Sequence, residues 1–151
     1  MKKDVKILPM TEESAVYAAE LEKICFSSPW SREALCEAAH RAEGNFLCAF
    51  IDGEFAGYAG MLCVLDEGQI CNVAVCPPFR RMGVGEALMA AQKEAGISRR
   101  LSVMMLEVRA GNTAAQRLYE KLGWEKIGVR RNFYSNPRED GFLYNLYLNI
   151  G

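Results

Sequence analysis

Two arginines and two glycines in residues 80–85, Arg80-Arg81-Met82-Gly83-Val84-Gly85, could bind an anion. They follow a strand-like run and lead into a helical pattern, so the loop amides would lie at a helix N-terminus, where the helix dipole favours negative charge. Glycine lets a ligand approach the backbone closely, and an arginine adds a charge-assisted contact. We therefore expect this loop to cradle a pyrophosphate.

Other interpretations of this loop are open from the residues alone. A P-loop requires GxxxxGK[ST], which the sequence lacks. The dinucleotide fingerprint GxGxxG is matched by Gly83 and Gly85, but Leu88 occupies its third glycine position. The remaining alternative is an ordinary glycine-rich helix start with a solvated arginine pair.

Two further side chains could carry acid–base chemistry. Glu107 follows the apolar run 101–106, where a carboxylate is costly unless it faces water or a partner. It is either a general base at the carboxyl end of a strand, where ligands gather, or an ordinary carboxylate paired with Arg109. Tyr119, on the helical stretch after Asn112, is either a general acid for a departing thiolate or a core tyrosine.

These residues need strands and helices to position them. The patterns predict strands at residues 5–9, 45–51, 54–65, 69–75, 101–108, 125–132 and 142–148. Asp52-Gly53 is a strong signal for a two-residue hairpin, because both central positions of a type I′ turn need positive φ. Residues 101–108 are almost continuously apolar, as in a central strand covered on both faces.

Four helices separate these strands. Thr11 and Ser31 are predicted N-caps of the first two helices. The first has Val16, Ala19 and Ile24 on its apolar side, and the second runs to about residue 41. A third helix follows the glycine-rich loop and closes at Gly96, and a fourth follows Asn112 and ends at Gly123.

The order β-α-α-β-β-β-α-β-α-β-β predicts an α/β (α+β) fold with a mixed sheet and helices on both faces. The 151 residues are 50% hydrophobic and 25% charged, which suits one globular domain over residues 1–151. The net charge of -1 disfavours a nucleic-acid partner. We also expect no membrane span, no secretory signal and no metal, and therefore a cytoplasmic protein whose six cysteines are reduced.

Residues 72–88 resemble the acetyl-CoA-binding motif of the GNAT acetyltransferases, Arg/Gln-x-x-Gly-x-Gly/Ala, matched at Arg80, Gly83 and Gly85. The resemblance implies a mostly antiparallel mixed sheet with a splayed strand pair, and acetyl-CoA as cosubstrate. It also implies that loop amides bind the cofactor pyrophosphate and that the preceding strand bonds the pantetheine and the acetyl carbonyl. The implied cofactor-binding residues are Val73, Ala74, Val75, Arg80, Arg81, Met82, Gly83, Val84, Gly85, Glu86 and Asn112.

Residues 106–124 look most like the RimI branch, the ribosomal-protein-alanine N-acetyltransferases. This resemblance implies Glu107 as the proton acceptor, Tyr119 as the proton donor, and a protein N-terminal alanine as acceptor. Residues 26–31, 130–134 and 138–140 resemble the substrate side of that branch. The implied contacts of the ribosomal-protein N-terminus are Phe26, Trp30, Arg131 and Tyr134.

Three rival functions stay open at this stage. A GNAT enzyme with another acceptor, such as a polyamine, an antibiotic or a lysine side chain, is disfavoured by residues 26–30 and 130–134. A non-catalytic acetyl-CoA-binding module is disfavoured because Glu107 and Tyr119 are both present. A nicotinamide-dependent enzyme is disfavoured because the third glycine of the fingerprint is missing.

Overall fold

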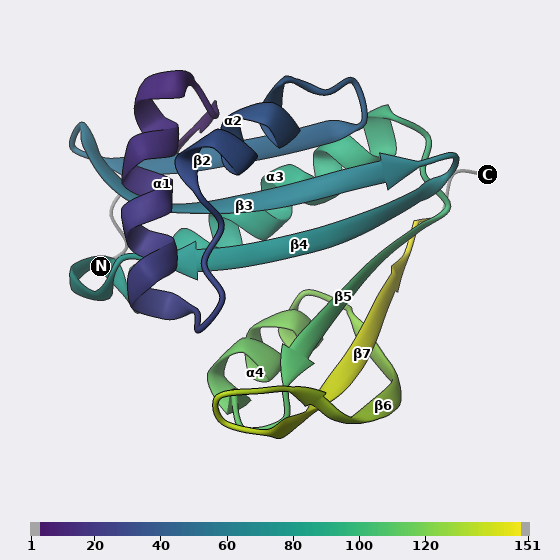
Figure 1. The fold of residues 1–151 in the computed structure, drawn as a ribbon. Coiled ribbons are helices and arrows are strands. Elements are labelled where there is room, and N and C mark those ends of the chain that lie inside the picture. Colours follow the sequence, from purple (N-terminus) through teal and green to yellow (C-terminus); the bar gives the residue numbers. More distant parts are fainter. Residues whose placement is uncertain (1–3, 149–151) are drawn as a thin grey trace.

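The fold was obtained as a computed structural model and is described for residues 4–148 (Figure 1). These residues contain seven strands, four α-helices and one short 3-10 helix. In chain order they are β1 Lys6–Pro9, α1 Glu12–Cys25, α2 Arg32–His40, β2 Gly44–Ile51, β3 Glu54–Val64, β4 Glu67–Val75, η1 Pro77–Phe79, α3 Val84–Ser98, β5 Val103–Arg109, α4 Thr113–Lys121, β6 Glu125–Tyr134 and β7 Glu139–Tyr147.

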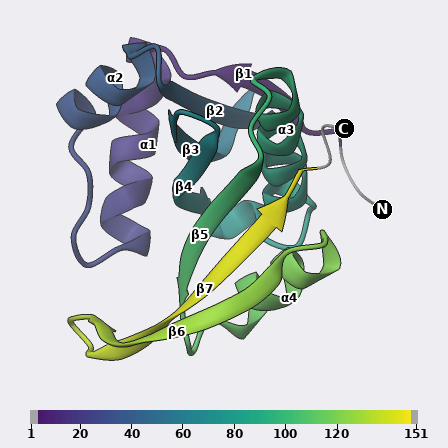
Figure 2. The same ribbon diagram turned by 90° about the vertical axis from the view of Figure 1, so that its right-hand side faces the viewer.

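One seven-stranded sheet, in the order β1-β2-β3-β4-β5-β7-β6, organises the molecule. Its neighbours are antiparallel except for the parallel pair β4 and β5. Figure 2 shows α1 and α2 on one face of the sheet and α3 and α4 on the other. The predicted α+β class, with a mixed and mostly antiparallel sheet between helices, is confirmed.

The strands β4 and β5 separate after a short stretch of contact. In the described part of the chain their pairing is confined to Glu67–Gln69 against Val103–Met105, and Figure 1 shows the two strands diverging beyond it. Pairing with β3 passes from Ile70 opposite Met61 to Asn72 opposite Gly60, so Cys71 is an extra residue in β4. Such a bulge bends the strand that carries it. The predicted splayed pair is therefore present.

Several helices and one hairpin turn begin or end where short sequence patterns predicted. The Thr11 side chain accepts a hydrogen bond from the Ser14 amide, and the Ser31 side chain does the same for Ala34. Asp52 and Gly53 have φ of 51° and 80°, as a type I′ turn requires. Gly123 has φ of 96° just beyond α4, which is the conformation that ends many helices.

Two local predictions are wrong. Gly96 does not close α3, which continues to Ser98; the glycine is buried, and a Cβ there would lie 2.9 Å from the Met104 sulfur. Its small size serves packing against β5 and not helix termination. Val16 and Ile24 of α1 are 44% and 66% exposed, so they do not form its buried face. That face consists of Ser14, Ala15, Ala18, Ala19, Leu21 and Glu22.

The buried apolar side chains lie on both faces of the sheet. One cluster packs α1 and α2 against β2, β3 and β4, and includes Leu35 and Tyr58. The other face packs α3 and α4 against the sheet, with Leu88, Met104 and Tyr144 among its residues. Within residues 4–148, no helix is both long enough and apolar enough to cross a membrane.

Candidate active site

A cavity of about 400 Å³, here called the inner pocket, lies where β4 and β5 separate. The two strands line it with Val73 and Glu107, and Tyr119 reaches it from α4. Phe26 and Tyr134 line it from the loop after α1 and from the end of β6. With Asn112, which also lines it, the structure brings the two candidate catalytic side chains and four predicted binding residues to one cavity.

Glu107 is well placed for proton transfer. Its side chain is 19% exposed, and Oε2 is buried with no hydrogen-bond partner among residues 4–148. Oε1 lies 3.8 Å from a guanidinium nitrogen of Arg130. The alternative pairing with Arg109 is wrong, because among the described residues the ion pair of Glu107 is with Arg130, while Arg109 pairs with Glu139 at 3.2 Å. A buried acceptor without a donor is costly, so Oε2 is suited to accept a proton or a hydrogen bond from a bound molecule.

Tyr119 belongs both to the inner pocket and to the core. It is 7% exposed, and its ring centroid lies 6.1 Å from that of Trp124 and 6.3 Å from that of Tyr144. Burial raises the pKa of Tyr119 from 10.0 to about 12. The phenol is therefore protonated at neutral pH, as a proton donor must be. Its core packing also fixes the direction of the hydroxyl.

The predicted anion cradle connects β4 to α3. Arg81 and Gly83 both have positive φ, of 67° and 84°, and Gly83 is the N-cap of α3. A glycine N-cap has no side chain to bond the first-turn amides, which stay available to an anion. Arg80 folds back over the strand, and its Nε donates to the Val75 carbonyl at 3.2 Å. A Cβ on Gly85 would lie 3.1 Å from Leu118, so this glycine allows α3 and α4 to approach each other.

The remaining predicted cofactor-binding residues are divided between the inner pocket and the anion cradle. Asn112 lines the inner pocket and caps α4, with Oδ1 accepting from the Ala115 amide at 3.2 Å. Val73 lines the pocket and, like Val75, packs on the α3 side of the sheet, whereas Ala74 packs toward α1. Residues 80–86 lie outside the inner pocket, beyond the end of β4. The splayed stretch of β4 therefore connects the cradle with Glu107.

A second cavity of about 470 Å³, the outer groove, shares six lining residues with the inner pocket: Cys25, Phe26, Asn72, Arg109, Phe133 and Tyr134. Trp30 lines it from the loop before α2, and residues 135–137 line it from the turn between β6 and β7. Arg131 is exposed on β6 and lines neither cavity. Burial and the Glu107 carboxylate raise the pKa of Tyr134, while Arg109 opposes the shift.

Sequence reasoning missed a buried carboxylate beside these cavities. Glu22 of α1 is 0% exposed and accepts hydrogen bonds from the Trp30 amide at 2.9 Å, from the Asn72 side chain at 2.9 Å and from the Tyr58 hydroxyl. It therefore joins the loop before α2 to the bulged part of β4. A glutamate among other glutamates in a helix gives no signal that it is buried.

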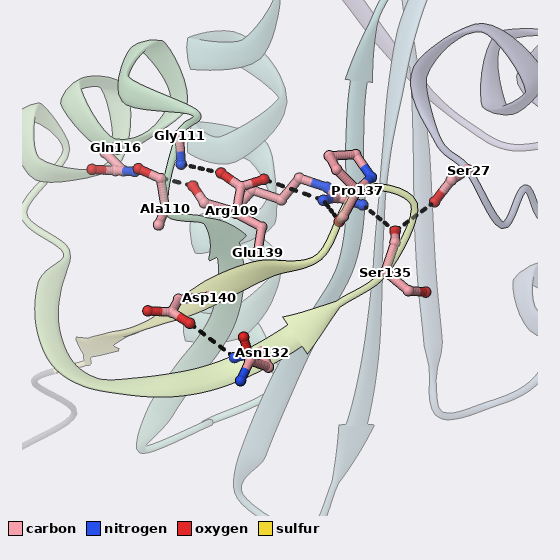
Figure 3. Close-up of polar contacts among 10 residues, drawn as sticks. All are labelled: Ser27, Arg109, Ala110, Gly111, Gln116, Asn132, Ser135, Pro137, Glu139 and Asp140. Atoms are coloured by element: carbon pink, nitrogen blue, oxygen red, sulfur yellow. Dashed lines mark hydrogen bonds and ion pairs between the residues drawn. The ribbon is translucent and has the colours of Figure 1, made fainter.

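A second network was also missed, although its residues lie in segments that the resemblance had marked. Arg109 donates to the carbonyls of Ser135 and Pro137 and to Glu139, and Glu139 accepts from the Gly111 amide (Figure 3). In the same view Asp140 accepts from the Asn132 amide at 2.8 Å. Arg109 thus bonds the turn directly, Glu139 bonds Arg109, and Asp140 bonds β6 before the turn.

Known proteins resemble this chain over nearly its whole length. Residues 15–124 match the Acetyltransferase (GNAT) family. The ribosomal protein bS18-alanine N-acetyltransferase of Escherichia coli (strain K12) is 32% identical over 148 residues, covering 97% of this chain and 98% of that protein. A Bacillus subtilis (strain 168) protein, provisionally assigned the same activity, is 32% identical over 150 residues, 99% of each chain.

Solved structures show the same fold. The crystal structure of the ribosomal-protein-S18-alanine N-acetyltransferase from Escherichia coli superposes with a TM-score of 0.88 and 29% identity, over 98% of this chain and 96% of that one. Ard1 from Thermoplasma volcanium, at 22% identity and a TM-score of 0.85, shares the fold over 95% of this chain and 97% of its own. A family match over more than half of the chain and relatives above 30% identity over nearly its whole length show that the chain belongs to the GNAT family of acetyltransferases.

Proposed function

We propose that this enzyme transfers the acetyl group of acetyl-CoA to the N-terminal amino group of a protein, with the N-terminal alanine of ribosomal protein bS18 as its acceptor. The observation that carries the chemistry is the buried Oε2 of Glu107, which has no hydrogen-bond partner in the described part of the chain and lies in a pocket shared with Tyr119. The bS18 acceptor comes from the relatives, which carry that activity in their names over almost the full chain. A ribosomal-protein acceptor is consistent with a cytoplasmic location.

The residues at the cradle fit acetyl-CoA. Left-handed backbone at Arg81 and Gly83 precedes the first turn of α3, and its amides can hold a pyrophosphate. Main-chain groups of residues 73–75 would bond the pantetheine arm, because β4 has no pairing to β5 there in the described chain. Because Oδ1 of Asn112 accepts from the first turn of α4, the NH₂ group is the part of that side chain left to bond the cofactor. When bound, acetyl-CoA supplies an acetyl group activated as a thioester.

The outer groove would hold the acceptor chain. Phe26 and Tyr134 line both cavities, so an N-terminus lying between them can reach Glu107 from the groove. Trp30 would contact the residues that follow. Arg131 would act only on acceptor residues that extend over β6, because it lines neither cavity.

Each catalytic step is assigned to a residue of this chain. Glu107 accepts a proton from the acceptor ammonium, which makes the amine nucleophilic. Amides of residues 73–75 stabilise the negative charge that develops on the acetyl oxygen, as pre-placed donors do. Tyr119 donates its proton to the sulfur as the carbon–sulfur bond breaks, and the second proton that the nitrogen loses as the amide forms restores the Tyr119 phenol. This is a direct-transfer mechanism with no acyl-enzyme.

The test is coenzyme A release from acetyl-CoA with a peptide that begins with alanine. Glu107→Gln should lower the rate by on the order of 100-fold or more, because general-base catalysis is lost while the shape is kept. Glu67→Gln, an exposed carboxylate at the start of β4, is the matched control and should retain the wild-type rate.

Other acceptors test the choice of acceptor, and the Glu107→Gln variant tests the mechanism. The same peptide with a blocked N-terminus should be inert. Equal rates with polyamines or free lysine would contradict the assignment to protein N-termini. Fast turnover by Glu107→Gln would keep the enzyme class and exclude Glu107 as the base.

A further inference from the structure

The turn between β6 and β7 is held in place by one arginine. Nη1 of Arg109 donates to the Pro137 carbonyl at 3.0 Å and to Glu139 at 3.2 Å, while Nη2 donates to the Ser135 carbonyl at 3.0 Å. The guanidinium also lies over the Tyr134 ring, 4.6 Å from its centroid. Its planar donor fork is therefore directed at the turn, which leaves it poorly placed to bind a substrate carboxylate.

Glu139 connects this turn to the other side of the site. One carboxylate oxygen faces Arg109 and the other accepts from the Gly111 amide, next to the Asn112 cap of α4. Gln116 of α4 donates to the carbonyls of Arg109 and Ala110 at 3.1 and 2.9 Å (Figure 3). The connection from β5 to α4 and the turn therefore form one hydrogen-bonded unit.

The same turn is a wall of the outer groove. Ser135, Asn136 and Pro137 line the groove opposite the loop after α1. Ser27 of that loop donates to the Ser135 carbonyl at 3.5 Å, so the two walls touch at one point (Figure 3). The wall lies beyond Tyr134, on the side of the groove away from the inner pocket.

We propose that the ion pair of Arg109 and Glu139 positions residues 134–139 as the wall that holds the acceptor chain beyond its first residue. The pair acts on affinity for the acceptor peptide, and it is neither a proton carrier nor an acetyl-CoA ligand. Its side chains are 28% and 24% exposed, so the contacts are partly shielded from water. The inference rests on the proposed function, because it assumes an extended peptide in the outer groove.

The variants are Arg109→Met and Glu139→Gln, with Arg100→Met and Glu67→Gln as matched controls. Arg100 is exposed in the turn before β5, at the opposite end of that strand, and Glu67 is exposed at the start of β4. Each is assayed with a hexapeptide that begins with alanine and with alaninamide. Alaninamide carries only the reacting residue, so it does not extend to the turn.

We expect kcat/KM for the hexapeptide to fall on the order of tenfold in both Arg109→Met and Glu139→Gln, because charge-assisted hydrogen bonds hold the wall in place. The loss should appear as a higher KM for the peptide. In Glu139→Gln, whose residue lines the outer groove and not the inner pocket, the kcat/KM for alaninamide and the KM for acetyl-CoA should stay within about twofold of wild type, as should every constant of the control variants. Equal losses with both acceptors would mean general damage to the site and would overturn the inference. No loss with the hexapeptide would overturn it as well.

A measurement without any acceptor separates this inference from the proposed function. Wild-type enzyme that does not acetylate the hexapeptide would contradict the proposed function alone. Amide hydrogen exchange over residues 134–140 should still accelerate on the order of tenfold in Glu139→Gln, with exchange in β2 and β3 unchanged. Unaltered exchange in the turn would overturn the inference that the Arg109–Glu139 ion pair positions it, whatever the acceptor is.

Discussion

The buried carboxylate of Glu22 gives the sharpest stability prediction. It accepts hydrogen bonds from the Trp30 amide, the Tyr58 hydroxyl and the Asn72 side chain, which come from three separate segments. Burial and the adjacent Glu22 carboxylate raise the pKa of Tyr58 well above its ordinary value, so this hydroxyl stays protonated and donates. Truncation to alanine would remove the common acceptor of all three donors.

The cost follows from what would be left behind. Each buried donor without a partner costs about 1–3 kcal/mol. Tyr58 is 1% exposed and would bear that cost in full, whereas Trp30 and Asn72 are partly exposed and can recover part of it from water. We expect Glu22→Ala to lower the free energy of unfolding by about 3–5 kcal/mol. Glu22→Gln keeps one acceptor oxygen, and Tyr58 and Asn72 can each accept from its amide, so about 1–2 kcal/mol is expected.

Urea unfolding at pH 7 measures these differences from the midpoint and slope. Glu20→Ala is the matched control on the same helix, because Glu20 is 66% exposed and pairs with the exposed Lys23 at 3.0 Å. It should change stability by less than about 0.5 kcal/mol. The reasoning fails if Glu22→Ala lies within about 1 kcal/mol of Glu20→Ala, or if Glu22→Gln is as destabilising as Glu22→Ala.

Three further predictions use other parts of the molecule. A Cβ on Gly57 would lie 2.5 Å from the Ala74 carbonyl, so Gly57→Ala should displace the splayed part of β4 and raise the KM for acetyl-CoA several-fold, measured with saturating peptide. Burial raises the pKa of Tyr119 to about 12, so the unfolded chain ionises first above about pH 10 and stability falls with pH. Tyr119→Phe should reduce the decrease in the free energy of unfolding by about 1.4 kcal/mol per pH unit between pH 10 and 12. Urea unfolding at several pH values measures this, and the same pH dependence in wild type and variant would contradict the prediction. The fully buried Gln92 donates to the Ala59 carbonyl at 2.9 Å, so Gln92→Leu should cost about 1–3 kcal/mol in thermal or urea unfolding.

Features set by neighbouring residues could be predicted from the sequence. The caps at Thr11 and Ser31 and the hairpin at Asp52-Gly53 each depend on a few consecutive residues, and all three are present. The order of the elements also indicated the class of sheet. Position alone left Glu107 open between a general base and an ordinary carboxylate, and it favoured a core role for Tyr119. The catalytic roles of both came from the resemblance to the RimI branch, and they stay predictions.

Features that depend on residues far apart in the chain could not be predicted from the sequence. Glu22 is 36 and 50 positions from Tyr58 and Asn72, so nothing near it in the chain indicates that it is buried. Arg109 and Glu139 are 30 positions apart, and Arg109 was considered only as a partner for its near neighbour Glu107. Gly96 follows a helical pattern as a terminating glycine would, and only the closeness of Met104 explains its place inside α3.

The separation of β4 and β5 has a consequence for solubility. Beyond Gln69 and Met105, the facing edges of both strands carry peptide groups that the described sheet does not pair. Unpaired strand edges are templates for association with other chains, and proteins ordinarily cover or blunt them. A ligand held along residues 73–75 would occupy this edge and stabilise the native state by RT ln(1 + [L]/Kd), about 2.7 kcal/mol at a hundredfold excess over Kd. The cosubstrate would then protect the enzyme from aggregation as well as take part in its chemistry.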